Sequence, residues 1–318
     1  MSTAFIFPGQ GSQAVGMGKT LAEAFPAARA VFEEVDAALN QSLTRIMWEG
    51  PADELTLTAN AQPALMAVSL AAMRVLESEA GLDLARDATF VAGHSLGEYS
   101  ALAAAGALTV TDAARLLRIR GRAMQEAVPV GQGAMAALLG LEYDQVVALA
   151  AEAAGHDVCE AANDNANGQV VVSGSTAAVE RAIEIAKARG ASRAILLPVS
   201  APFHCRLMEP AAEAMAAALA QASVRAPVVP LISNVRAAPV IDPAEIVRLL
   251  VEQVTGTVRW RESVIYMAGA GVTRAVEVGA GKVLSGLVRR IARTISVTAV
   301  GTPEEVAAFI AARPTPAA

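Results

Sequence analysis

The sequence GHSLG at residues 93–97 places a serine between two glycines, at a point where a strand is expected to turn into a helix. Apolar residues 89–92 precede it and the small-residue segment 98–105 follows it. A sharp strand-to-helix turn needs small flanking residues, and it leaves the serine hydroxyl projecting above the sheet. The alternative is a chance tight turn in which the serine only caps the helix. The context favours Ser95 as a covalent nucleophile.

A serine hydroxyl needs a base within hydrogen-bond reach, and the chain holds three histidines. His94 is the chain neighbour of Ser95 and points elsewhere, whereas His156 stands in a polar loop. His204 follows the end of an expected strand, which is where open α/β sheets place functional loops. Elimination therefore selects His204 as the base. Cys205 is a weaker candidate nucleophile because it does not stand in a sharp strand-to-helix turn. A free cysteine is, moreover, most often a small buried hydrophobic residue.

No aspartate stands where it would complete a triad. Asp112, Asp144, Asp157 and Asp164 are expected at helix starts or in loops. The sequence thus favours a dyad, in which another group, such as a backbone carbonyl, must orient His204.

The glycine-rich segment FPGQGSQ at residues 7–13 follows the first expected strand. Its backbone N–H groups would lie at the carboxyl end of that strand, where they could receive an oxyanion. The same composition also suits an ordinary connection, so both interpretations stay open.

Arg120 stands on an otherwise apolar stripe of the helix expected over residues 112–127. Arg115, Arg118 and Arg122 follow helical spacing and are predicted to form a solvated face. An arginine on an apolar stripe can be a bidentate receptor for an anionic substrate group, or it can form an internal salt bridge.

The elements around these residues alternate between short apolar strands and alanine-rich helices, which predicts an α/β fold with a mostly parallel sheet. The expected strands are 3–7, 89–92, 229–233, 275–278 and 296–300. The expected helices are 19–40, 63–80, 98–105, 112–127, 243–255, 261–270 and 282–293.

Residues 134–199 follow a different pattern, with strands at 134–141, 158–162, 169–173 and 194–199 and helices at 143–154 and 176–189. The order βαββαβ is typical of a ferredoxin-like unit. We therefore predict an inserted ferredoxin-like subdomain at 129–199, within a discontinuous core of residues 1–128 and 200–318.

Composition narrows the function classes. The chain has 318 residues, 54% of them hydrophobic and 18% charged, and a net charge of −6. That charge argues against a nucleic-acid or anionic-membrane binder, and no apolar run is long enough to span a bilayer. Two cysteines and three histidines cannot form a common closed zinc site, so no metal is expected. The N-terminus has no signal-like segment, and the two cysteines do not suggest a secreted disulfide framework, so we expect a cytoplasmic protein.

Taken together, the chain resembles the malonyl-CoA:acyl carrier protein transacylases of type II fatty-acid synthesis and the related acyltransferase domains of polyketide synthases. The resemblance covers nearly the whole chain. It rests on the segments already named and on further short matches, at residues 93–98, 120–125, 163–169, 202–205, 251–260 and 279–287.

The resemblance implies a hydrolase-like core and a two-step exchange through malonyl-Ser95, with His204 as the base. It implies that the backbone carbonyl of Gln253 orients His204 and that the backbone N–H groups of Gln10 and Leu96 form an oxyanion hole. It also implies substrate-binding residues. Arg120 would bind the malonyl carboxylate, Phe203 would disfavour an acyl group with an α-methyl branch, and Asn163 and Asn165 would also contact the substrate. The segment 163–168 departs from the serine-proline pattern more common in the family.

The implied partners are malonyl-CoA and acyl carrier protein, with no tightly bound cofactor and with a monomeric enzyme. Carrier proteins are usually strongly acidic, so a basic patch should dock one. The sequence offers two: Lys187, Arg189 and Arg193, or Lys282, Arg289 and Arg290. A serine esterase or thioesterase would instead need a triad acid and have no need for Arg120. A non-catalytic scaffold would leave Ser95 unlabelled.

Overall fold

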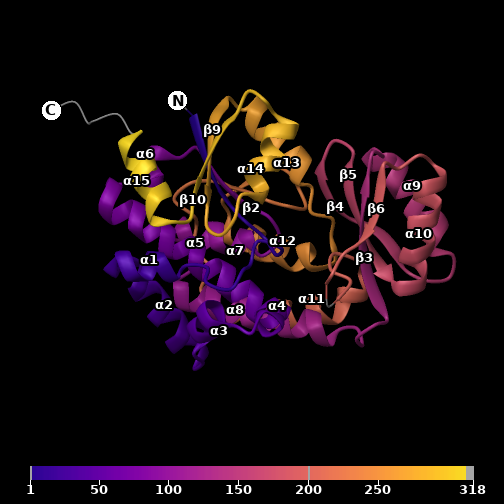
Figure 1. The fold of residues 1–318 in the computed structure, drawn as a ribbon, viewed down its shortest axis with the longest axis horizontal. Helices are drawn as coiled ribbons and strands as arrows, with labels where there is room; N and C mark the ends of the chain where they lie inside the picture. Colours follow the sequence, from indigo (N-terminus) through magenta and orange to yellow (C-terminus); the bar gives the residue numbers. More distant parts are fainter. Residues whose placement is uncertain (1, 200, 313–318) are drawn as a thin grey trace.

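The computed structural model describes residues 2–199 and 201–312 and divides them between two sheets, which occupy a larger and a smaller lobe (Figure 1). The larger sheet has the strand order β10-β9-β1-β2-β7-β8, and its neighbouring strands are parallel except for the pair β7 and β8. Its strands are β1 (Ser2–Phe7), β2 (Phe90–Gly93), β7 (Leu231–Ile232), β8 (Pro239–Val240), β9 (Val272–Val278) and β10 (Ser296–Val300). A mixed α/β fold with a mostly parallel sheet is thereby confirmed.

Helices surround this sheet. They are α1 (Lys19–Ala24), α2 (Pro26–Leu39), α3 (Leu43–Glu49), α4 (Ala52–Thr56), α5 (Thr58–Ala80), α6 (Leu84–Asp87), α7 (Gly97–Ala104), α8 (Val110–Glu126), α11 (Glu209–Leu219), α12 (Pro243–Thr255), α13 (Trp260–Gly269), α14 (Val283–Ile291) and α15 (Pro303–Ala311), with a 3₁₀ turn at Arg206–Met208. None of the helices within the described ranges is long and apolar enough to cross a membrane.

The smaller lobe follows the order β3 (Gly133–Leu139), α9 (Tyr143–Ala154), β4 (Cys159–Ala166), β5 (Gln169–Ser175), α10 (Thr176–Ala188) and β6 (Arg193–Leu196). Its strands form an antiparallel sheet in the order β4-β5-β3-β6. Alternation along β3 explains its two faces: Ala136 and Leu138 pack with α9 and α10, whereas Met135 joins the core of the larger lobe.

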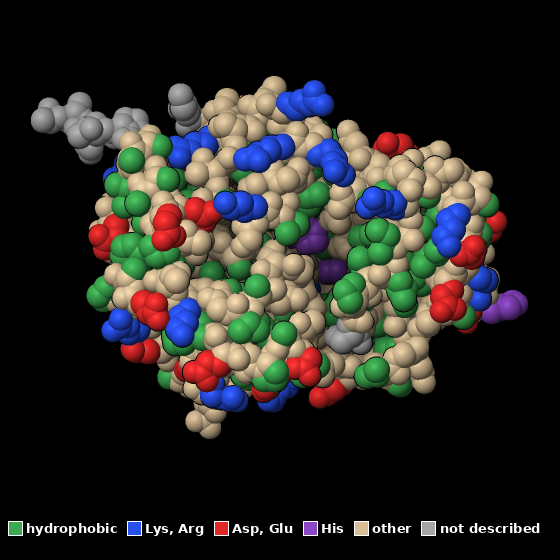
Figure 2. Space-filling model, viewed as in Figure 1, with side chains coloured by type: hydrophobic (Ala, Val, Ile, Leu, Met, Phe, Trp, Pro, Cys, Tyr) green, Lys and Arg blue, Asp and Glu red, His purple; other side chains and the backbone are tan. Residues whose placement is uncertain are grey.

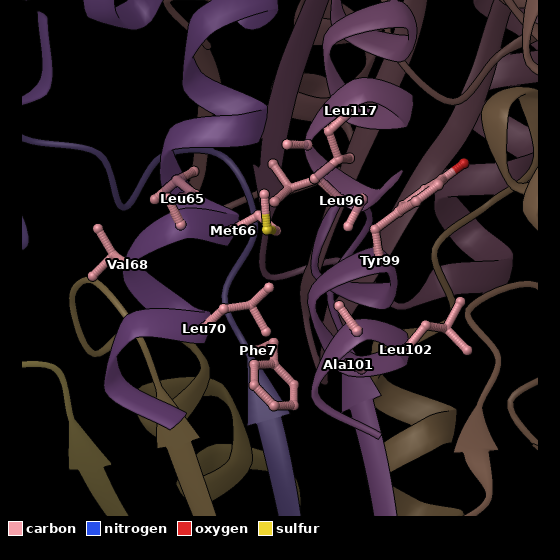
Figure 3. Close-up of a cluster of buried hydrophobic side chains, with 14 of the residues drawn as sticks. Phe7, Leu65, Met66, Val68, Leu70, Leu96, Tyr99, Ala101, Leu102 and Leu117 are labelled. Carbon is pink, nitrogen blue, oxygen red and sulfur yellow. The ribbon is translucent and has the colours of Figure 1, made fainter. Parts of the chain in front are cut away.

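The core of the larger lobe brings the elements of the site together. Helix α5 is buried over most of its length and packs against α8, and α7 packs on β1 and β2. Figure 3 shows Met66 of α5 facing Leu96, with Leu117 of α8 beside them. The start of α7 is therefore fixed from several sides.

Three sequence expectations about local structure were wrong. The helix expected over 19–40 breaks at Phe25, which is extended because the following Pro26 disfavours helical geometry in the residue before it. Asp164 lies in β4 rather than in a loop or at a helix start, because β4 continues to Ala166. Arg118 does not belong to a solvated face: it is buried, and its Nη1 donates to Asn60 Oδ1 at 2.7 Å.

Candidate active site

The turn around Ser95 joins the end of β2 to the start of α7. Gly93 pairs with Phe7 across the sheet, so this turn and residues 8–13 leave the sheet at the same edge. A Cβ on Gly93 would come within 1.9 Å of the Gly97 backbone, and a Cβ on Gly97 within 2.3 Å of Phe7 O. Ser95 itself has a φ of 53°, in the left-handed region that a serine rarely adopts. The turn therefore has the tight, strained geometry expected of a nucleophile elbow.

His204 lies against the Ser95 hydroxyl. Its Nε2 is 2.8 Å from Ser95 Oγ, and its Nδ1 is 2.9 Å from the backbone oxygen of Gln253. A carbonyl oxygen only accepts, so Nδ1 carries the hydrogen and Nε2 is left to accept the serine proton. The backbone carbonyl of Gln253 thus occupies the position that a carboxylate has in a Ser-His-Asp triad.

The environment keeps His204 uncharged. Burial lowers the pKa of His204 to about 3, and the positive charge of Arg120 acts in the same direction, against the opposing effect of the hydrogen bond to Gln253. A neutral imidazole is the form that can accept a proton.

Arg120 reaches the same hydroxyl from α8. It is 1% exposed, and its Nη2 donates to Ser95 Oγ at 3.1 Å and to Gln253 Oε1 at 2.7 Å. Its Nη1 donates to Gln62 Oε1 at 2.7 Å, while its Nε has no acceptor among the described residues. Arg120 forms no ion pair with a described carboxylate, so the salt-bridge alternative is not what the structure contains. Because its hydrogen-bond partners are neutral, no protein carboxylate compensates the positive charge of this guanidinium, and an anionic ligand can pair with it.

A pocket of about 540 Å³ opens onto these groups. It is lined from the larger lobe by residues that include Ser95 and Arg120, and from the smaller lobe by Met135, Asn163 and Leu197. Figure 2 shows the corresponding hollow between the two lobes, with histidine side chains at its floor. Phe203 also lines the pocket and is 8% exposed.

Two residues that line this pocket have a backbone N–H group without a partner among the described residues. Gln10, whose side chain accepts from Thr58 Oγ1 at 3.0 Å, and Leu96, which precedes α7, both line it. Within the described residues neither backbone N–H donates to an acceptor. Unpaired N–H groups beside a nucleophile can receive a developing oxyanion.

The remaining sequence candidates make no hydrogen bond with Ser95 Oγ among the described residues, although His94 also lines the pocket rather than pointing away from it. His94 Nε2 is 2.8 Å from Asn165 Oδ1, so Asn165 supports the elbow from β4, and His156 is exposed in the smaller lobe. Burial raises the pKa of the Cys205 thiol to about 11, which disfavours a reactive thiolate at neutral pH. No cluster of three metal-ligating side chains occurs in the described part of the chain.

Sequence reasoning missed three buried polar residues that contact the site. Gln62 left no readable signal, and Glu98 lies within the matched segment 93–98 but received no role. Asn234 left one, because it follows the end of β7 at the same sheet edge as the elbow.

A hydroxyl held between a neutral imidazole and a guanidinium, with two free N–H groups nearby, can carry out acyl transfer through a serine ester. The guanidinium can in addition bind an acyl group that ends in a carboxylate.

Comparisons with known proteins agree with this chemistry. The family model described as the acyl transferase domain matches residues 4–311. The chain is 47% identical over 306 residues to a malonyl CoA-acyl carrier protein transacylase of Bacillus subtilis, covering 95% of this chain and 94% of the relative.

Two solved structures are similar over nearly their whole length. The acyl-carrier-protein-S-malonyltransferase of Bartonella henselae superposes with a TM-score of 0.95 at 58% identity, covering 98% of this chain and 99% of that one. A malonyl-transacylase in complex with the acyl carrier protein of a type II polyketide synthase has a TM-score of 0.95 at 40% identity, covering 98% and 100%.

Proposed function

The chain belongs to the acyl transferase domain family, and from that premise we propose that it transfers the malonyl group of malonyl-CoA to the phosphopantetheine thiol of acyl carrier protein, supplying fatty-acid synthesis. The observation that carries the proposal is the position of Ser95 Oγ between His204 Nε2 and Arg120 Nη2. A nucleophile, its base and an anion receptor thus meet at one atom.

The distance from Arg120 to Ser95 supports a short dicarboxylic acyl group. In a malonyl ester on Ser95, one methylene separates the ester carbonyl from the free carboxylate. Because Nη2 lies 3.1 Å from Oγ, that carboxylate can contact the guanidinium while the ester stays on the serine. Of the five N–H donors of Arg120, three have acceptors among the described residues, and the Nε–H and one Nη1–H have none.

In the first half-reaction, Ser95 Oγ attacks the thioester carbonyl of malonyl-CoA while its proton passes to His204 Nε2. The N–H groups of Gln10 and Leu96 stabilise the tetrahedral oxyanion. The carbon–sulfur bond then breaks, and His204 returns the proton to the sulfur of coenzyme A. The carbonyl of Gln253 stabilises the protonated imidazole by accepting from Nδ1.

In the second half-reaction, the carrier-protein thiol gives its proton to His204 and attacks the malonyl-Ser95 ester. The carbon–oxygen bond breaks, and the proton returns to Ser95. Every proton moves through one imidazole, so neither a metal nor a tightly bound cofactor is required.

Pocket residues define the substrate further. Phe203 stands beside His204 and would contact an α-methyl branch, which favours malonyl over branched acyl groups. Asn163 lines the pocket from β4 and contributes to substrate binding there, whereas Asn165 acts through its hydrogen bond with His94.

Charge favours α14 over the smaller lobe as the docking surface for the acidic carrier protein. Lys187 and Arg189 are paired with Glu184 and Glu152. Of that set only Arg193 has no carboxylate partner among the described residues. Near α14 Lys282 is paired with Glu305, but both Arg289 and Arg290 donate to neutral oxygens, of Val297 and Gln169, the latter at 2.8 Å. Figure 2 shows lysine and arginine side chains along the upper side of the hollow, where Figure 1 places α13 and α14.

Finer features of organisation belong to the same proposal. The order βαββαβ and the strand order β4-β5-β3-β6 support a ferredoxin-like subdomain at 129–199, inserted into a hydrolase-like core at 1–128 and 200–318. Residues 1, 200 and 313–318 of that division lie outside the described residues. We further propose a monomeric, cytoplasmic enzyme.

Transfer to the carrier protein tests the function directly. Malonyl-enzyme freed of coenzyme A should pass its malonyl group to holo acyl carrier protein faster than to water, as measured by the masses of both proteins. Release of free malonate at the same rate with and without carrier protein would instead indicate a hydrolase.

A further inference from the structure

The backbone of Ser95 is held on both sides by buried side-chain amides. Asn234 Oδ1 accepts from Ser95 N at 2.7 Å, and Asn234 Nδ2 donates to Gly93 O at 2.6 Å. Gln253 Nε2 donates to Ser95 O at 2.9 Å. The strained elbow therefore does not hold its shape by glycines alone.

Asn234 is itself fixed by its own backbone. Its N–H donates to Glu98 Oε1 at 2.7 Å, and its carbonyl accepts from Arg259 N at 2.9 Å. It is 0% exposed, and all four of its polar groups have partners. An amide with this many buried partners has one orientation only.

Glu98 joins the two amides. Its second carboxyl oxygen accepts from Gln253 Nε2, and its first accepts from Asn234 N. Through Gln253 the same set of contacts reaches His204 Nδ1 and Arg120 Nη2. One buried carboxyl group thus connects the support of the nucleophile to the support of the base.

We infer that Asn234 is a positioning residue for the proposed acyl transfer. Its side chain forms hydrogen bonds with the two peptide groups that precede Ser95 and so fixes the conformation of the turn. That conformation sets the direction in which Ser95 Oγ and the Leu96 N–H point toward the substrate. Because Asn234 occupies the Ser95 N–H, that group is unavailable to the oxyanion, and the elbow contributes only the N–H of Leu96. The inference rests on the proposed function, since it concerns the same nucleophile.

The expected effect falls on the rate of the chemical step rather than on substrate binding. Asn234 does not line the pocket, whereas a misplaced nucleophile lowers the rate by as much as about 100-fold. Asn234→Ala should therefore lower the single-turnover rate of malonyl-Ser95 formation by about 10- to 100-fold. The malonyl-CoA concentration that gives half the maximal rate should stay unchanged, and slow acylation by acetyl-CoA should fall by the same factor.

Asn60→Ala is the matched control. Asn60 is also buried and also makes two side-chain hydrogen bonds, with Arg118 and with Glu54 O, but it does not line the pocket. Both variants lose comparable contacts, so thermal unfolding should show comparable destabilisation. Only Asn234→Ala should lose acylation rate.

Asn234→Asp provides a second variant in case the alanine variant does not fold. It keeps an oxygen for Ser95 N–H but has no N–H for Gly93 O, and it should also acylate more slowly than the wild type. A wild-type rate in a folded Asn234 variant, or an equal loss in Asn60→Ala, would overturn the inference. Wild-type enzyme that forms no malonyl-serine at all would contradict the proposed function instead.

Discussion

Arg120 donates a hydrogen bond from Nη2 to Ser95 Oγ at 3.1 Å, so the proposed anion receptor and the proposed nucleophile are in direct contact. This contact connects substrate choice to chemistry. In the proposed reaction the residue that accepts the acyl group lies next to the residue that binds its free carboxylate, which limits the distance between the carbonyl and the carboxylate of a good substrate.

Replacement of Arg120 by alanine should change substrate preference. The malonyl carboxylate would lie unpaired in a buried pocket, which costs about 2 to 5 kcal/mol of transition-state binding. At about 1.4 kcal/mol per tenfold, kcat/KM for malonyl-CoA should fall roughly thirtyfold to a few thousandfold. Acetyl-CoA has no such carboxylate, and its slow transfer should be spared.

Arg118→Ala is the control for that experiment. Arg118 is buried on the same helix but bonds to Asn60 and does not line the pocket. It should leave the ratio of malonyl to acetyl transfer unchanged. Equal losses for both thioesters in Arg120→Ala would mean that Arg120 has a structural role only.

His204→Ala should lower the acylation rate by about two to four orders of magnitude, the usual contribution of a positioned general base. The variant should keep the wild-type fold by circular dichroism. Burst kinetics close to the wild type would assign the base to another residue, and His94, which also lines the pocket, would be tested next.

The pH profile should report the unusual environment of His204. Because the pKa of His204 is lowered to about 3, the imidazole stays neutral as the pH falls below the ordinary histidine value. Burial also raises the pKa of Glu98 to about 8, so that carboxyl group stays largely protonated below about pH 7. Accordingly, kcat/KM for malonyl-CoA should stay level from about pH 7 to pH 5, whereas an unperturbed histidine would lose activity near 6.5. A half-maximal rate near pH 6.5 would contradict this assignment.

Stability must be followed in the same experiment. In the unfolded chain this histidine takes up a proton near its ordinary pKa, whereas the folded protein resists protonation. Its contribution to the free energy of unfolding is therefore present above the ordinary value and is lost as the pH falls toward 3. Unfolding curves at each pH separate this loss from a change in the chemical step.

Reversal of charge on α14 should weaken carrier-protein docking without affecting acylation. Arg290→Glu places a negative charge where the structure has an arginine with a neutral partner, so KM for acyl carrier protein should rise and malonyl-Ser95 formation should be unchanged. Arg189→Glu on the smaller lobe is the control, because Arg189 is already paired with Glu152. A larger effect from Arg189→Glu would move the docking surface to the smaller lobe.

Strong local patterns allowed much of the fold to be predicted from the sequence. The bounds expected for α9, α12 and β10 agree with the structure, since each has clear periodicity and clear ends. Helices α11 and α15 were not predicted, although a proline near the start of each, and Thr302 as a cap for α15, were available signals.

The residues of the candidate site were likewise only partly predictable from the sequence. Ser95, His204 and Arg120 could be found because a nucleophile elbow, a scarce residue type and a charge on an apolar stripe are local features of the chain. Gln62 of α5 contacts the site only because distant segments fold together, and no local spacing records such a contact. Asn234 also comes from a distant segment, and its one sequence signal, a place just after β7, does not show which groups it contacts.

Intact-mass measurement after mixing the enzyme with malonyl-CoA tests the central claim most directly. The wild type should gain the mass of one malonyl group, peptide mapping should locate it on Ser95, and Ser95→Ala should gain none. An undiminished adduct on Ser95→Ala, or an adduct mapped to Cys205, would contradict the assignment of the nucleophile.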